Sequence, residues 1–158
     1  MIRLRIDLAQ QSLCVLDDEC ELKRYSVSTS KFGAGAKNGS YCTPLGRHIV
    51  RAKIGAGAPS GAVFVRRRPT GEIWTPDLHA RFPGRDWILT RILWLSGREP
   101  GLNRLGDVDT MRRYIYIHGT PDSAEMGRPG SIGCIRMRDA EIIELFDRVP
   151  VYAEVTIG

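Results

Sequence analysis

Short segments in which apolar and polar residues alternate run along most of this chain, and such alternation predicts β-strands with one buried face. The first strand is expected to bury the apolar residues at positions 2, 4, 6 and 8, and a return strand follows at 12–16. The acidic residues 17–19 predict a hairpin turn before a third strand over 22–28. The same signs place the remaining expected strands at 47–52, 63–65, 88–95, 114–117 and 151–157.

One segment has the residue spacing of a helix instead. Residues 140–147 follow Asp139, which is expected to cap the helix. The expected apolar side of this helix is formed by Ile142, Ile143, Leu145 and Phe146. Stretches rich in glycine and proline predict loops at 33–39, 68–86 and 120–130, the second long enough to act as a lid. We therefore expect a single domain over residues 1–158, mostly β, built as a sandwich or partly closed barrel with one short C-terminal helix.

The composition is that of a globular protein, with 42% hydrophobic and 26% charged residues, which argues against a disordered chain. No apolar run approaches the ~18 residues of a transmembrane helix, and the first eight residues lack the apolar stretch of ~7–15 residues that a secretory signal needs. With Met1 as the native start we expect a cytoplasmic protein without a membrane partner, and a periplasmic one if the native chain starts further upstream. The four cysteines are then expected to be free thiols, and without a C-x-x-C pair no zinc site is expected.

The net charge of +5 comes mostly from scattered arginines, with one tight cluster at Arg66–Arg67–Arg68. No nucleic-acid fold signature accompanies the cluster, so we expect no nucleic-acid partner and interpret it as solvated surface with some anion-binding positions. A pocket that handles peptide carboxylates would also favour arginine, because a guanidinium pairs with a carboxylate through two hydrogen bonds.

Two segments near the C-terminus hold the candidate chemistry. His118 is expected at the end of an apolar strand, and Cys134 follows in a turn next to Gly133. A thiol and an imidazole in contact are the minimum parts of a cysteine acyl-transfer site, and the backbone N–H groups of Gly133 and Cys134 are expected to form an oxyanion hole. The alternative for Cys134 alone is a buried structural cysteine. His48 and His79 lack comparable surroundings and are interpreted as hydrogen-bonded core histidines.

These segments resemble the catalytic signature of the L,D-transpeptidases of the YkuD type, which are cysteine enzymes of peptidoglycan metabolism. The resemblance rests on Tyr116 to Thr120 and on Ser131 to Met137, and residues 28–46 resemble the N-terminal sheet of the family. It covers most of the chain and implies a YkuD-like fold with long active-site loops. One departure is Ile132, where the family commonly has a histidine, and this departure bears on acceptor binding more than on the chemistry.

The resemblance also implies a role for each matching residue. Cys134 is the expected nucleophile, His118 is its base, and the backbone carbonyl of Gly119 is expected to orient the imidazole. The expected substrate-binding residues are Tyr116, Ser131, Gly133 and Arg136. Ser131 and Gly133 are expected to shape the turn, and Arg136 either braces the loop or pairs with a substrate carboxylate. No cofactor or metal is implied.

The activity implied by the resemblance is acyl transfer from peptidoglycan stem peptides, with carbapenem β-lactams as covalent inhibitors. For a cytoplasmic protein we expect an L,D-carboxypeptidase that removes the terminal D-alanine from stem tetrapeptides during cell-wall recycling. The alternatives are an L,D-transpeptidase that forms 3–3 cross-links and a non-catalytic muropeptide-binding module. Further candidates for substrate contact are Trp74, Arg91, Trp94 and Asn103, although core packing explains a tryptophan equally well.

Overall fold

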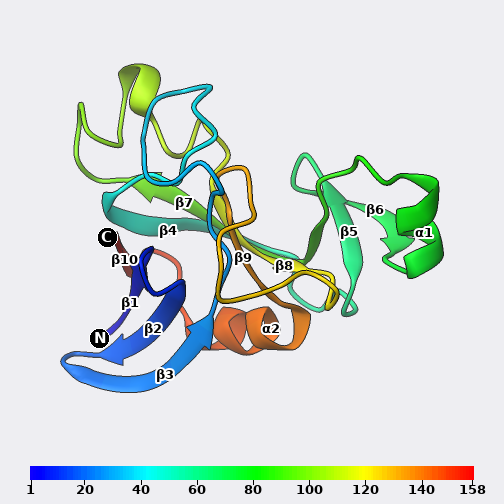
Figure 1. Cartoon of the computed structure of the whole chain (residues 1–158). Helices are drawn as coiled ribbons and strands as arrows, with labels where there is room; N and C mark the ends of the chain where they lie inside the picture. Colours follow the sequence, from blue (N-terminus) through cyan, green and yellow to red (C-terminus); the bar gives the residue numbers. More distant parts are fainter.

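A computed structural model describes all residues from 1 to 158, and its strands form one curled mixed sheet (Figure 1). The strands are β1 (Ile2–Asp7), β2 (Ser12–Asp17), β3 (Cys20–Ser26), β4 (Gly46–Ile54), β5 (Ala62–Val65), β6 (Arg68–Ile73), β7 (Ile88–Gly97), β8 (Tyr116–Thr120), β9 (Ile135–Arg138) and β10 (Glu154–Ile157). The helical elements are α1 (Pro76–Arg81), the 3-10 turn η1 (Gly106–Val108) and α2 (Asp139–Arg148). The mostly β fold expected from the sequence is thereby confirmed.

The main path of the sheet runs β3-β2-β1-β10-β4-β7-β5-β6, and β8 and β9 branch from β7. The last strand, β10, lies between β1 and β4, so the first and last strands are neighbours in the sheet (Figure 1). β10 pairs with β1 in parallel and with β4 in antiparallel orientation. Because β10 fills the position between β1 and β4, the sheet is continuous only when β10 has paired with both of them.

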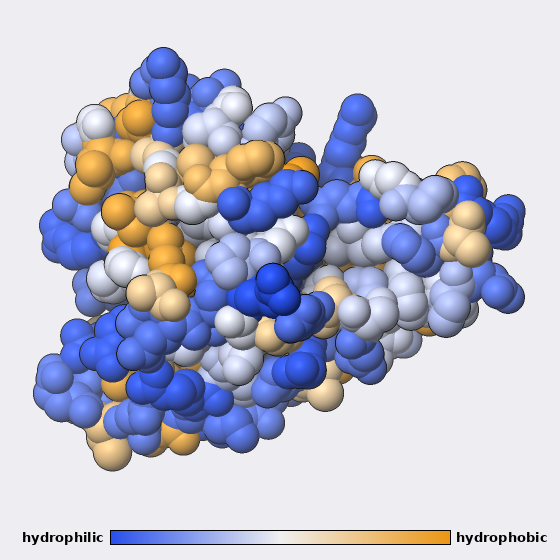
Figure 2. Space-filling model, in the orientation of Figure 1, coloured by the Kyte–Doolittle hydropathy of each residue, from blue (hydrophilic) through white to orange (hydrophobic).

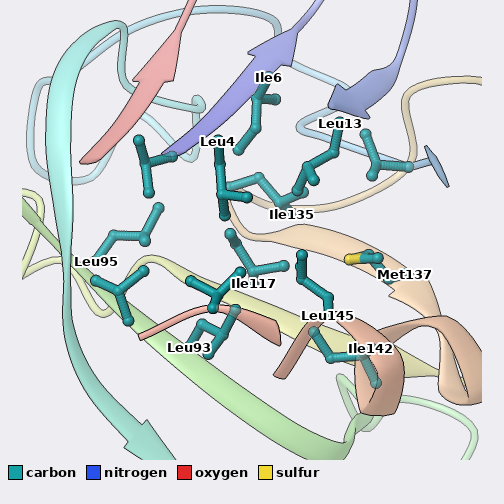
Figure 3. Close-up of a cluster of buried hydrophobic side chains, with 14 of the residues drawn as sticks. Leu4, Ile6, Leu13, Leu93, Leu95, Ile117, Ile135, Met137, Ile142 and Leu145 are labelled. Carbon is teal, nitrogen blue, oxygen red and sulfur yellow. The ribbon is translucent and has the colours of Figure 1, made fainter. Parts of the chain in front are cut away.

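The main core fills the inside of the curled sheet and is covered by α2 (Figure 3). Alternate residues of β1, such as Leu4 and Ile6, point inward, as the sequence pattern predicts. Leu93 of β7 and Ile117 of β8 meet them from the opposite wall. Helix α2 contributes its buried residues Ile142, Leu145 and Phe146. The expected C-terminal helix is thus confirmed, one residue longer at each end than the pattern indicates.

Strand β7 connects the core to a hairpin that projects from it. On one edge β7 pairs with β4 and β5, and on the other with β8, with a shift of register between Leu89 and Ile92. Thr90 lies in this irregularity with a φ of 76°, and its hydroxyl donates to Asp139 (2.6 Å) while accepting from the Gly61 N–H (2.9 Å). A bulge of this kind bends a strand, and β5, β6 and α1 extend away from the core on this side (Figure 1).

Four local expectations differ from the structure. The expected lid over 68–86 contains β6 and the short helix α1, which begins at a proline after the Thr75 cap. Asp139 is the first residue of α2 and not its cap, because its carboxylate accepts from Thr90 instead. β8 begins at Tyr116 because Tyr114 has a left-handed φ of 57°, and it continues to Thr120, so that His118 lies inside the strand. The closing strand begins at Glu154 because Tyr152 has a φ of 70°.

Neither helix has the length and apolar character that crossing a lipid bilayer requires. The outer surface over β1–β3 is mostly polar, whereas apolar residues gather over the loops beside β4 and β7 (Figure 2). The exposed apolar residues of those loops include Phe32, Tyr41, Leu45, Leu102 and Leu105.

His48 and Asn103 connect β4 to the loop that follows β7. His48 is fully buried, its Nδ1–H donates to the Gly46 carbonyl (3.0 Å), and its Nε2 accepts from the Thr110 hydroxyl (2.9 Å). The buried Asn103 amide donates to the carbonyls of Leu45 and Arg47 at 3.0 and 3.1 Å. The interpretation of His48 as a hydrogen-bonded core histidine is confirmed, and Asn103 braces loops instead of facing a ligand.

The buried position of His48 predicts a loss of stability in acid. Burial lowers the pKa of His48 from 6.5 to about 4, so the unfolded chain binds a proton that the folded chain resists. We expect the free energy of unfolding to fall by about 3 kcal/mol through this group as the pH is lowered from 6.5 to 4. The measurement is urea unfolding at several pH values, with His48→Gln as the control because glutamine does not titrate. An equal pH slope in both proteins would contradict this assignment.

Candidate active site

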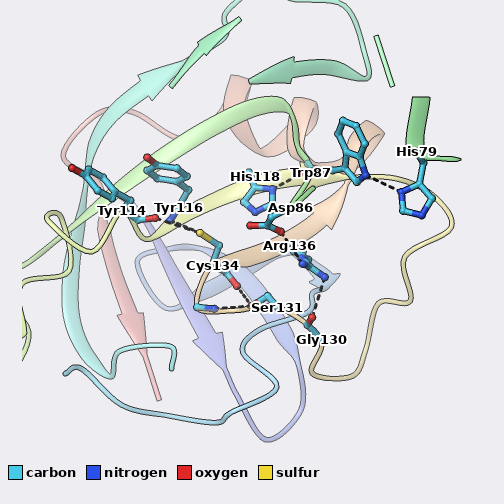
Figure 4. A network of polar contacts seen from close by, with 12 residues as sticks. His79, Asp86, Trp87, Tyr114, Tyr116, His118, Gly130, Ser131, Cys134 and Arg136 are labelled. Atoms are coloured by element: carbon cyan, nitrogen blue, oxygen red, sulfur yellow. Dashed lines mark hydrogen bonds and ion pairs between the residues drawn. The ribbon is translucent and has the colours of Figure 1, made fainter. Parts of the chain in front are cut away.

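The register between β8 and β9 places His118 of β8 and Cys134, the residue before β9, on the same side of two neighbouring strands. The strands run parallel with His118 opposite Arg136, so Cys134, two residues earlier, lies level with Tyr116. The Tyr116 backbone N–H donates to the Cys134 sulfur (3.3 Å), and the thiol donates to the Tyr114 carbonyl (3.4 Å; Figure 4). Cys134 lines an open pocket of about 520 Å³. The thiol is therefore fixed by the neighbouring strand and accessible to a ligand.

The imidazole of His118 is fully buried and is held in one orientation. Its Nδ1 bonds to the backbone carbonyl of Gly119 at 2.6 Å, and a carbonyl only accepts, so Nδ1 carries the proton. Nε2 has no hydrogen-bond partner and presents a free lone pair. Burial lowers the pKa of His118, while Asp86 acts in the opposite direction. The ring is thus a neutral imidazole whose Nδ1–H is held by the Gly119 carbonyl, and its role as a base stays a prediction.

Cys134 and His118 do not form an ion pair in the resting structure. No hydrogen bond joins the sulfur to Nε2, and the sulfur points toward the backbone of Tyr114 and Tyr116, with the His118 ring beside Asp86 (Figure 4). Burial raises the pKa of the Cys134 thiol to about 12, while the Tyr116 N–H lowers it. The site therefore holds a thiol and a neutral imidazole, and proton transfer requires the two atoms to come within hydrogen-bond distance.

The turn before Cys134 is closed by Ser131. Its hydroxyl donates to the Cys134 carbonyl (2.6 Å) and accepts from the Gly133 N–H (3.2 Å). Gly133 has a φ of 130°, which a residue with a side chain rarely adopts, so glycine is required here. Because the Gly133 N–H is already bonded, only one of the two donors expected for the oxyanion hole is free, the backbone N–H of Cys134.

Gly119 is required at the base for a different reason. A Cβ at this position would collide with the Asp139 carboxylate and the Leu89 carbonyl. The same Asp139 carboxylate accepts from Thr90, and its pKa is raised to about 6 by burial. The start of α2 and the bulge of β7 therefore pack directly against the residue that orients His118.

Arg136 braces two loops above the site. Its guanidinium donates to the Gly130 carbonyl (3.1 Å) and forms an ion pair with Asp86 (3.0 Å). Of the two roles expected for Arg136, the structure shows the bracing one. Asp86 was missed by the sequence reasoning because nothing local distinguishes it from other acidic residues in the lid. Asp86 and Ile132 both line the cysteine pocket and also a second pocket of about 380 Å³ on the other side of them.

The remaining candidates from the sequence have mostly structural positions. Trp94 packs edge to face against Tyr116 and in a tilted arrangement against Tyr114, and its indole N–H donates to the Met111 carbonyl (3.1 Å). Arg91 is buried and donates to two backbone carbonyls. Trp74 lines the second pocket and not the pocket that contains Cys134.

Two further polar groups lie near the site. His79 is exposed on α1 and accepts from the Trp87 indole (2.9 Å), so it is hydrogen-bonded but not a core residue. Tyr116 lines the cysteine pocket, and its hydroxyl accepts from Arg67 (2.9 Å). The structure contains no group of three or more His, Cys, Asp or Glu side chains arranged to hold a metal ion.

Comparison with known protein sequences finds similarity to L,D-transpeptidases. The family model described as the L,D-transpeptidase catalytic domain (YkuD) matches residues 2–157. Probable L,D-transpeptidase YbiS of Escherichia coli K12 is 33% identical over 94 residues, which cover 58% of this chain and 29% of that protein. The chain therefore spans less than a third of the length of this relative.

Solved structures show the same fold. The L,D-transpeptidase from Mycobacterium smegmatis and the enzyme LdtMt1, described in complex with imipenem, both align with a TM-score of 0.59 and 18% sequence identity. In each case the alignment covers 99% of this chain and 58% of the other. At this level of identity the likeness concerns the fold alone.

The raised pKa of Cys134 predicts slow alkylation at neutral pH. Only the thiolate reacts with iodoacetamide, and its fraction rises about tenfold per pH unit at pH values below the pKa, which is about 12 for Cys134. The alkylation rate of Cys134 should therefore rise about tenfold per pH unit between pH 7 and 10. The measurement is mass spectrometry of the Cys134 peptide, with the exposed Cys20 in the same protein as internal reference. Asp86→Asn removes a negative charge that raises this pKa and should accelerate the reaction. A plateau below pH 8 would contradict the prediction.

Proposed function

Because the chain belongs to the L,D-transpeptidase catalytic domain family of the YkuD type, we propose that it is a cysteine acyl-transfer enzyme acting on peptidoglycan stem tetrapeptides. In the proposed reaction it removes the terminal D-alanine and transfers the acyl group to water, as an L,D-carboxypeptidase does. The observation that carries the proposal is the accessible thiol of Cys134 on the same side of the sheet as His118, whose Nδ1 is held by the Gly119 carbonyl and whose Nε2 has no hydrogen-bond partner.

The first half of the reaction forms a thioester. His118 Nε2 takes the proton of the Cys134 thiol as the sulfur attacks the carbonyl carbon of the third residue of the stem peptide. The negative oxygen that develops is stabilised by the Cys134 backbone N–H. The imidazolium then gives its proton to the nitrogen of D-alanine, the peptide bond breaks, and D-alanine leaves.

The second half regenerates the thiol. Water gives one proton to His118 Nε2 and attacks the thioester carbonyl, the tripeptide leaves with a new carboxylate, and the sulfur recovers the proton. Water as acceptor is supported by Ile132, which is 43% exposed at the rim shared by the two pockets. The family that this chain resembles commonly has a histidine at this position, whereas isoleucine offers no hydrogen bond to an incoming amine.

Cross-link formation is the second candidate function. It is favoured by the pocket of about 380 Å³ beyond Asp86, which gives a second peptide chain a place next to the thioester. The two candidates share the acyl-enzyme and differ only in the group that attacks it. A non-catalytic muropeptide-binding module, the third alternative, would bind the same peptides without turning them over.

A cytoplasmic role in cell-wall recycling is part of the proposal. It is supported by Cys14, Cys20 and Cys42, which are free thiols like Cys134, as is usual for a protein kept in a reducing compartment. Cell fractionation of the native protein tests this part, and recovery from the periplasm would contradict it.

Incubation with a defined stem tetrapeptide tests the activity. We expect tripeptide and free D-alanine in equal amounts by mass spectrometry. Cys134→Ser and His118→Asn should each lower kcat by at least about 10³-fold, because each removes an obligatory reactant of the first step. Circular dichroism checks that both variants remain folded. Turnover that persists in both variants, or binding without any turnover in the wild type, would rule out the proposed enzyme.

The acceptor is tested by adding a D-amino acid to the same reaction. Hydrolysis should dominate in the wild type, and Ile132→His should increase the fraction of D-amino-acid-exchanged product. Exchanged or cross-linked products that already dominate in the wild type would instead support the transpeptidase.

A carbapenem should acylate the same sulfur. Since the thiol attacks a carbonyl carbon, imipenem is expected to leave one covalent adduct on the peptide that contains Cys134, detected by intact mass and peptide mapping. Cys134→Ser should remain unmodified, and Cys20 serves as the reference for nonspecific labelling. An unmodified wild-type mass after long incubation would count against a cysteine acyl-enzyme.

A further inference from the structure

The turn between β5 and β6 is formed by two arginines in an unfavourable backbone conformation. Arg66 and Arg67 have φ angles of 49° and 64°, and Val65 pairs with Arg68 on either side of them. Two-residue turns of this geometry favour Asn-Gly, because left-handed backbone costs residues with long side chains free energy. Turn geometry alone therefore does not explain why arginine occupies both positions.

Both turn arginines line the pocket that contains Cys134, whereas the third arginine of the cluster does not. Arg66 and Arg67 are among its lining residues, and Arg68 is exposed outside it. The run that the sequence presents as one basic cluster is thus divided by the hairpin. Two of its charges lie at the pocket that contains Cys134, and the third lies outside this pocket.

Arg67 is held in place but keeps most of its donors. Its guanidinium carbon lies 4.8 Å from the centre of the Trp94 ring and 4.7 Å from that of Tyr114, and its Nη1 donates to the Tyr116 hydroxyl (2.9 Å). This is its one hydrogen bond, out of the five N–H donors of a guanidinium. A planar group fixed by aromatic rings loses less entropy when it binds an anion.

The positive charge at this wall has no acidic partner in the protein. Neither Arg66 nor Arg67 forms an ion pair. Asp86 is the single acidic residue lining the pocket, and it pairs with Arg136. Arg113 is already committed to the backbone carbonyls of Gly35 and Cys42. An anion entering this pocket therefore meets two guanidiniums that are free to bind it.

Tyr116 sets the spacing between this wall and the nucleophile. Its backbone N–H contacts the Cys134 sulfur (Figure 4). Its hydroxyl, at the far end of the ring, contacts Arg67. The Cys134 sulfur and the Arg67 guanidinium are therefore separated by about the length of one tyrosine side chain. In a bound peptide whose acyl carbon lies at the sulfur, the next residue is the terminal one, and an extended residue spans about 3.5 Å. This residue and a hydrogen bond from its carboxylate to the guanidinium together cover a distance similar to that between the sulfur and Arg67.

We infer that Arg66 and Arg67 form a subsite for the terminal carboxylate of the peptide whose last residue is cleaved off. The inference rests on the proposed function, since it assigns this carboxylate to the residue that leaves. An enzyme that removes a single terminal residue must distinguish a chain end from an internal peptide bond. A pair of guanidiniums next to the nucleophile supplies that distinction, because an amide at the same position carries no charge.

The test compares the tetrapeptide as free acid with the same peptide ending in a carboxamide. Both give the same acyl-enzyme, so the difference between them reports recognition of the terminal group. We expect the wild type to prefer the acid by about 10- to 100-fold in kcat/KM, mostly through KM. The double variant Arg66→Asn/Arg67→Gly suits the turn and removes both charges, and it should lose this preference. Arg68→Gln is the matched control and should keep it.

Two further measurements distinguish an effect of lost charge from an effect of lost folding stability. Thermal unfolding checks that the double variant folds, and Arg67→Lys, which retains the charge without the planar fork, should show an intermediate preference. The inference is overturned if the wild type does not distinguish acid from amide, if the double variant keeps the full preference, or if Arg68→Gln loses it equally.

A binding measurement keeps this inference separate from the proposed function. If the wild type turns over neither peptide, the proposed function fails, and calorimetry with Cys134→Ala then decides about the subsite alone. Tighter binding of the acid than of the amide, abolished by Arg66→Asn/Arg67→Gly, supports the subsite. Equal affinity for both peptides overturns it.

Discussion

The parallel register of β8 and β9 is the constraint on which the candidate active site depends. Because strand residues alternate between faces, Ile117 and Ile135 enter the main core, while His118 and Cys134 lie on the other side. A shift of one residue would exchange these faces, placing the imidazole in the core and isoleucine at the pocket. The hydrophobic effect that stabilises the domain therefore also fixes the placement of the reactive pair.

Burial determines the protonation state of that pair. A low-dielectric environment disfavours both the thiolate and the imidazolium, so the resting site contains two neutral groups. The nearby ion pair of Asp86 and Arg136 adds opposing charges, since Asp86 favours the imidazolium but disfavours the thiolate. In the proposed reaction, charge separation is most favourable when the proton moves as the sulfur attacks, which avoids a long-lived buried ion pair.

The sequence predicted the local features well and the long-range ones poorly. Alternation located most strands, and the motif named Cys134, His118 and the carbonyl of Gly119 as candidates, of which the structure places Cys134 in a pocket and the Gly119 carbonyl on His118 Nδ1. The branch formed by β8 and β9 was missed because parallel pairing between distant segments leaves no periodic signal in either one. Asp86 was missed for a related reason, because its role comes from Arg136, fifty residues later in the chain. The left-handed backbone at Tyr114 hid the true start of β8 from a propensity argument.

The arginines show why net charge is a poor guide to partners until the fold is known. Arg91, Arg113 and Arg136 are taken up by backbone carbonyls or by Asp86, so these charges brace loops and do not attract ligands. The composition cannot separate them from the two arginines at the hairpin turn, because the difference lies in whether the protein supplies an acceptor. A guanidinium that is held by backbone carbonyls or a carboxylate would lose those hydrogen bonds if it turned toward an anion. Among the arginines that line the cysteine pocket, Arg66 and Arg67 are therefore the two whose side chains bond to neither a backbone carbonyl nor a carboxylate.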